Sequence, residues 1–141
     1  MSYEIQRLEL DTKIRSIQSI APFDCYTQDG IVNIDRWRTQ KIRPLFIGKE
    51  GYEKGDRIES SVTKWLDNEP EDACRAAPRT WQTTAYTSFG LQHDLINRAQ
   101  MPGLHAAPGV IDSLRTIAFI NVGKYGADTS TPWKRLDALY Q

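Results

Sequence analysis

Two short apolar runs place the tightest limits on what this chain can fold into. The stronger run, residues 117–122, is rich in β-branched and aromatic side chains, and the other, residues 44–47, ends at Gly48. Continuous apolar runs of this length are typical of strands buried on both faces of a parallel sheet. We therefore expect adjacent or near-adjacent parallel strands over residues 45–47 and 117–120.

The segments around these runs predict helices. Apolar residues recur at helical spacing near the N-terminus and in residues 58–66 and 80–89, and Gly90 is placed to end the last of these helices. Thr131 and Pro132 match the N-cap and first position of another helix that continues to the C-terminus. Strand, helix and strand in this order predict a single α/β domain over the whole chain.

Two buried strands do not complete a sheet, because stable sheets normally contain three or more strands. The missing strands could come from residues 28–36, from residues 92–112, from a partner chain or from a C-terminal half that this chain lacks. Two Pro-Gly pairs, at 102–103 and 108–109, predict turns in the second of these stretches. If the chain does not supply the strands itself, we expect a homo-oligomer or a protein partner to complete the sheet.

The charge balance limits the partners of the chain. Lys and Arg number 18, as do Asp and Glu, so any contact with nucleic acid must be local and not the result of a general positive field. The N-terminus has no basic leader followed by a long apolar run, and no stretch approaches 18 apolar residues. We expect a cytoplasmic protein with no membrane partner.

Cysteine and histidine give no metal-binding pattern. Cys25 and Cys74 are far apart and form no Cys-x-x-Cys pair, which indicates reduced thiols and not a disulfide framework or a zinc site. His93 and His105 lie in polar or turn-forming segments, where exposed, solvated side chains are expected. The sequence therefore predicts neither a metal nor another cofactor.

The carboxyl ends of parallel strands are the usual place for ligand chemistry in α/β proteins. Gly48 permits close approach of the backbone, Glu50 supplies a carboxylate and Tyr52 can stack on a flat ligand such as a base. The alternative is that Gly48 and Gly51 only shape a turn, with a solvated run of charges around it. Asn121, at the end of the second run, could likewise read a ligand or only cap a turn.

Both strand ends resemble motifs of the uracil-DNA glycosylase superfamily. Residues 48–52, Gly-Lys-Glu-Gly-Tyr, resemble the family's Gly-x-Asp-Pro-Tyr motif, and residues 119–121, Phe-Ile-Asn, resemble the strand that ends in its base-reading asparagine. The resemblance implies that Glu50 is the catalytic carboxylate that orients or activates water. It also implies that Tyr52 shapes the base pocket and that Asn121 pairs with the edge of the base.

The same resemblance covers roughly residues 42–141 and implies a three-layer α/β/α fold with a parallel sheet, of which this chain has the N-terminal part. It implies a role in DNA repair, with Gly48 lining the substrate site. Lys49 and Lys124 are then placed to contact the DNA backbone.

This sequence departs from the family pattern in three ways. Gly51 stands where the family has proline, Glu50 stands where it has aspartate, and the later His-Pro-Ser motif has no counterpart. One alternative is therefore a non-catalytic binding or regulatory module that keeps the fold and works with a partner protein. Another is a small α/β enzyme for a nucleotide or phosphate ligand, although the glycines are too sparse for a P-loop.

Overall fold

The two apolar runs form neighbouring strands of a three-stranded sheet. A computed structural model of the chain describes residues 2–17, 26–50 and 59–123. The order of the strands is β2-β5-β3. Their bounds are Gly30–Ile31 for β2, Leu45–Glu50 for β3 and Ala118–Gly123 for β5. The predicted adjacency of the two runs is confirmed, and the third strand comes from the first of the candidate stretches.

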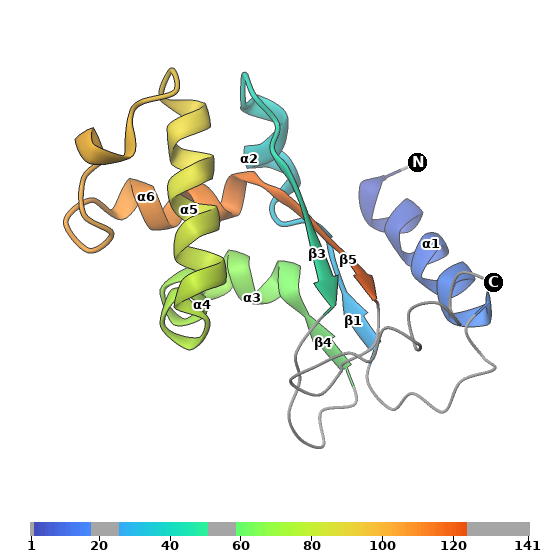
Figure 1. Ribbon diagram of the computed structural model, residues 1–141. Coiled ribbons are helices and arrows are strands. Elements are labelled where there is room, and N and C mark those ends of the chain that lie inside the picture. Colours follow the sequence, from blue (N-terminus) through green and yellow to red (C-terminus); the bar gives the residue numbers. More distant parts are fainter. Residues whose placement is uncertain (1, 18–25, 51–58, 124–141) are drawn as a thin grey trace. The chain divides into compact units, whose positions relative to one another are not determined.

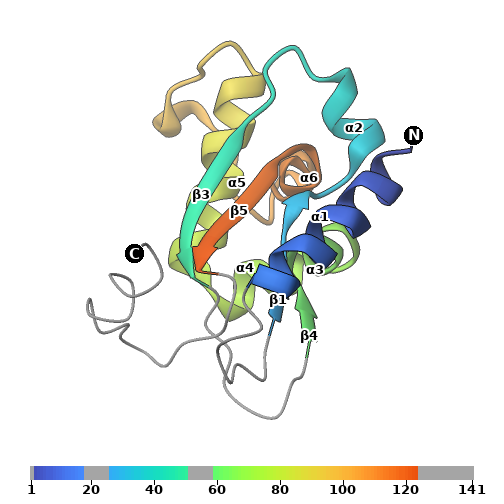
Figure 2. The same cartoon turned by 90° about the vertical axis from the view of Figure 1, so that its right-hand side faces the viewer.

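The sheet is mixed. β3 and β5 run in the same direction (Figures 1 and 2), as the sequence predicts for them. β2 is antiparallel to β5, with Gly30 opposite Phe119 and Ile31 opposite Ala118. Gly30 has φ 130, a value that disfavours any residue with a Cβ, so the chain enters β2 through a conformation that needs glycine. The α/β class agrees with the prediction, but the expectation of an all-parallel sheet is wrong.

Within the described residues of unit 2, only one face of the sheet is buried. Phe119 is buried and Phe46 packs against the core, whereas Leu45 and Ile47 are 53% and 70% exposed. Because side chains alternate along a strand, the helices cover the face of Phe46 and Phe119 and leave the other face open. Ile120 is exposed on β5 as well. The expectation that both faces are buried is therefore wrong.

Contacts divide the chain into two compact units. Unit 1 comprises Met1–Gln28, Lys49–Ser60 and Gly123–Gln141, and unit 2 comprises Asp29–Gly48 and Ser61–Val122. The described elements of unit 1 are α1 (Tyr3–Ile17), which confirms the helix predicted near the N-terminus, and the paired strands β1 (Tyr26–Gln28) and β4 (Glu59–Ser61). The single domain expected from the sequence stays a prediction. The predicted C-terminal helix lies outside the described residues.

The helices of unit 2 begin in one of two ways: a side chain accepts a hydrogen bond from a backbone N–H of the first turn, or the first residue is a proline, which has no N–H. Asn33 and Ser61 are N-caps whose side-chain oxygens accept hydrogen bonds from backbone N–H groups of the first turn. Three other helices begin with proline. The helices are α2 (Ile34–Thr39), α3 (Val62–Asn68), α4 (Pro70–Ala76), α5 (Pro78–Gln92) and α6 (Pro108–Asp112), with 3-10 turns η1 (Arg98–Gln100) and η2 (Ser113–Thr116).

Two of the sequence-based boundaries are corrected. Helix α5 continues through Gly90 to Gln92, and the φ-positive residues that reverse the chain are Asp94 and Leu95. Pro108 begins α6, where a turn was expected, because proline suits the first position of a helix. A third boundary also differs: the helix predicted over residues 58–66 begins only at Val62, as α3, because residues 59–61 pair with β1 as strand β4. The helix predicted over residues 80–89 is confirmed within α5.

The core of unit 2 lies between the sheet and these helices (Figure 1). Its fully buried side chains include Leu66, Val110, Leu114 and Ile117. Each such side chain contributes roughly 1.5–3 kcal/mol through burial of its apolar surface. None of the helices in the described part of the chain has the length and apolar character needed to cross a bilayer.

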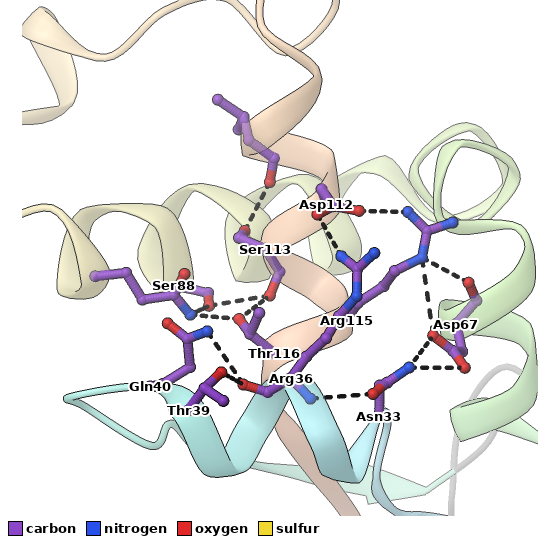
Figure 3. Close-up of polar contacts among 12 residues, drawn as sticks. Asn33, Arg36, Thr39, Gln40, Asp67, Ser88, Asp112, Ser113, Arg115 and Thr116 are labelled. Atoms are coloured by element: carbon purple, nitrogen blue, oxygen red, sulfur yellow. Dashed lines mark hydrogen bonds and ion pairs between the residues drawn. The ribbon is translucent and has the colours of Figure 1, made fainter.

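A polar network joins the helices at the edge of this core (Figure 3). The Asp112 carboxylate accepts hydrogen bonds from Arg36 and Arg115, and the Nε of Arg115 donates to the backbone carbonyl of Asp67. The side chain of Asn33 donates to the Asp67 carboxylate at 3.1 Å. The network therefore connects α2, α3 and the α6–η2 segment.

Candidate functional site

The structure describes four of the six predicted site residues. Gly48 and Lys49 lie in β3, Glu50 is the last residue of that strand, and Asn121 lies in the neighbouring strand β5. The side chain of Lys49 is exposed. The other two predicted residues, Tyr52 and Lys124, lie outside the described residues.

Gly48 and Asn121 are in direct contact. A Cβ atom built on Gly48 would lie 2.5 Å from Oδ1 of Asn121 and 2.7 Å from Cζ of Phe119. Both distances are far below van der Waals contact, so any side chain at residue 48 would displace its neighbours. Glycine is therefore required here by close approach, whereas the sharing of one site by Glu50 and Asn121 stays a prediction.

Asn121 is a buried polar residue of the middle strand β5, which continues beyond it to Gly123. Its relative exposure is 3%, and its backbone N–H donates a hydrogen bond of 2.6 Å to Oδ2 of Asp29. The paired residues of β2 begin at Gly30, and Asp29 is the residue before it. The Asp29 side chain therefore accepts from a backbone N–H of β5 that lies just beyond the paired residues. A hydrogen bond to a charged acceptor is stronger than a neutral one, and it fixes the backbone of Asn121.

Three aromatic rings support this corner from the core side. The Phe119 ring that contacts Gly48 lies 4.8 Å from the Trp81 ring of α5, at an interplanar angle of 58°. Trp81 in turn meets Trp65 of α3 edge to face at 6.3 Å. These tilted and edge-to-face contacts are favourable geometries for aromatic pairs, and they hold Phe119 in place beneath the strand ends.

Asp29 is the residue that the sequence did not single out. Its only signal in the sequence is the Asp-Gly pair that it forms with Gly30, which indicates a turn and not a site. The structure places its carboxylate against the backbone of Asn121. The corner formed by Asp29, Gly48 and Asn121 thus combines a carboxylate, a backbone position with no room for a side chain and a buried amide.

The two histidines and Cys74 are not part of this corner. His93 and His105 are exposed, as predicted, and His93 stacks on Phe89 with ring centroids 3.9 Å apart. Cys74 is a buried free thiol whose pKa is raised by burial and, secondarily, by the charge of Glu71. The described residues contain no cluster of three or more His, Cys, Asp or Glu side chains that could hold a metal ion.

Comparisons with known proteins return no match: no protein-family model, curated protein or solved structure is similar to this chain. The corner of Asp29, Gly48 and Asn121 must therefore be interpreted from its own geometry and from the motifs in the sequence.

Proposed function

We propose that the ends of β3 and β5 bind a nucleic-acid base and that the chain acts on it in the manner of a uracil-DNA glycosylase. The observation that supports this most directly is the contact between Gly48 and Asn121. It joins the two segments that resemble glycosylase motifs, although a long stretch of sequence separates them. The burial of Asn121 suits an amide that recognises a base in a dry pocket.

In the proposed reaction, Glu50 accepts a proton from a water molecule whose oxygen attacks the sugar carbon C1′. The bond between C1′ and the base nitrogen breaks, and its electron pair leaves with the base, which then takes up a proton. Asn121 hydrogen-bonds the edge of the base, and Tyr52 stacks on its face. Lys49 and Lys124 contact the DNA backbone near this site.

The decisive experiment measures base release from uracil-containing single- and double-stranded oligonucleotides. Glu50→Gln should lower the rate of release by a factor of about 10² to 10⁴ and leave the affinity for DNA nearly unchanged, because it removes only the proton acceptor. Glu53→Gln, in the same stretch of sequence, is the matched control and should retain the wild-type rate. Equal rates for wild type and Glu50→Gln would overturn the assignment of Glu50.

A non-catalytic binding module is the second candidate. The absence of a His-Pro-Ser motif from the sequence favours it, because that motif supplies the second catalytic group of the glycosylases. In this case the wild type releases no base, yet Tyr52→Ala still weakens binding by roughly 1–3 kcal/mol, the value of one base–aromatic stack.

Such a module would work with a partner protein or a second copy of the chain. The exposed Leu45 and Ile47 on β3, at the edge of the sheet, support this assembly.

A further inference from the structure

A second surface of unit 2 combines positive charge with hydrogen-bond donors. It is an open groove of about 580 Å³ between the outer face of α5 and the segment that contains η1. Arg79, Thr83 and Thr87 follow one another at four-residue spacing along the helix and so lie on one face. Tyr86 lies on the same side of the helix, and Arg98 reaches the groove from η1.

The position of Arg98 is fixed. Its guanidinium carbon lies 3.5 Å from the centroid of the Tyr86 ring, which is a stacked cation–π contact. Asn97 caps η1 by accepting a hydrogen bond of 2.9 Å from the backbone N–H of Ala99. The methyl group of Met101 rests on Gly90, where any Cβ would lie 2.5 Å from it. The cation is therefore held against the helix before any ligand binds.

Among the described residues, no carboxylate neutralises the positive charge of this groove. No carboxylate lines it, and within the described part of the chain neither Arg79 nor Arg98 forms an ion pair. Three other arginines, Arg36, Arg75 and Arg115, are each paired with an aspartate. In a chain with no net charge, two unneutralised arginines in one groove indicate an anionic ligand.

We propose that this groove binds the phosphodiester backbone of a single nucleic-acid strand, an inference that goes beyond the proposed function. Arg79 and Arg98 contact successive phosphates, and the hydroxyls of Thr83 and Thr87 donate further hydrogen bonds. An open groove with cations on two separate segments suits a chain that enters and leaves, whereas a mononucleotide favours an enclosed pocket.

The groove and the base site lie on opposite sides of α5. Arg79 lies two residues before Trp81, and Trp81 packs on Phe119, the ring that supports Gly48 and Asn121. Residues two apart on a helix point to nearly opposite sides, so Arg79 faces the groove while Trp81 faces the core. The groove therefore binds its strand independently of base recognition at β3 and β5.

The test is the binding of a fluorescein-labelled oligothymidylate of about 20 nucleotides, followed by anisotropy over a range of salt concentrations. Arg79→Gln combined with Arg98→Gln should weaken binding roughly tenfold and lower the salt slope by about 1.4, which is 0.7 for each of two phosphates. Arg75→Gln is the matched control: it removes one exposed arginine outside the groove and should leave both quantities near the wild-type values.

Two results would overturn the proposal. One is that the double variant, with an unchanged circular dichroism spectrum and melting temperature, binds the oligonucleotide as the wild type does. The other is that thymidine monophosphate competes as well as the oligonucleotide, which would indicate a nucleotide pocket. Base release is measured in parallel: if the wild type releases none while the double variant loses strand binding, the groove stands and the glycosylase assignment fails.

Discussion

At the scale of single residues, Gly48 shows how little space separates the two strand ends. Gly48→Ala places a carbon 2.5 Å from Oδ1 of Asn121 and 2.7 Å from the ring of Phe119. We expect a loss of about 1–3 kcal/mol in the free energy of unfolding, the usual cost of overpacking, measured by urea denaturation followed through tryptophan fluorescence. Gly103→Ala is the control, because its new Cβ would meet only Ala106 at 3.7 Å.

A double-mutant cycle identifies which neighbour causes this loss. Asn121→Ala removes the oxygen that lies closest to residue 48, so Gly48→Ala should cost less in that background than in the wild type. Equal costs in the two backgrounds would mean that Asn121 moves aside freely, and the contact that supports the base site would then carry no constraint.

At the scale of helices and strands, Asn33 has two structural roles. Its side-chain oxygen accepts from the backbone N–H of Arg36 at the start of α2, and its amide donates to Asp67 at the end of α3. Asn33→Ala should lower the free energy of unfolding by about 1–2 kcal/mol, measured by chemical denaturation. Asn97→Ala, which removes the cap of the three-residue η1, should cost less.

The variant Asn33→Asp separates these two roles. Aspartate remains a good N-cap, but it places a negative charge beside Asp67 and removes the amide donor. We expect it to be less stable than wild type. A variant as stable as wild type would show that only the cap of α2 matters.

The sequence predicts the elements that carry an apolar pattern and misses those that do not, α4 among them. β3, β5, α3 and α5 have apolar runs or helical periodicity, and their residues overlap those that the pattern indicates. α2 has only six residues, half of them charged, and β2 has two, so neither produces a recognisable period. These elements form because β5 and the helices provide partners for them.

The same limit applies to the candidate site. Gly48 and Asn121 were predictable because each ends an apolar run, and the carboxyl ends of neighbouring parallel strands meet. Asp29 was not predictable, because its role depends on the backbone N–H of Asn121, which is far away in sequence. Gly90 was misread as a helix end, since its actual constraint is the methyl group of Met101.

At the scale of the whole molecule, the buried thiol of Cys74 links folding to pH. Burial, and then the charge of Glu71, raise its pKa above the ordinary value of 9.0. A raised pKa in the folded state gives a stability contribution that is complete below pH 9.0 and is lost as the pH rises toward the folded pKa. In a Cys25→Ser background, the free energy of unfolding should therefore decline above that pH.

Cys74→Ala is the comparison that assigns this decline to the thiol. It should flatten the alkaline part of the stability curve relative to the parent, although the smaller side chain also lowers stability at every pH. A thiol reagent added to the folded parent at pH 8 should react slowly, and at the rate of a free thiol once denaturant is present. Parallel curves for parent and variant above pH 9.0 would remove Cys74 as the cause.

The hydrogen bond from Asn121 to Asp29 also bears on how the protein avoids aggregation. An unpaired backbone N–H on a strand is a template onto which a strand of another molecule can add, and repeated addition leads to fibres. In this protein the backbone N–H of Asn121 in β5, just beyond the end of β2, already donates to the carboxylate of Asp29. An incoming strand would have to displace a charged acceptor, so Asp29 disfavours the addition of a strand at this border of the folded sheet.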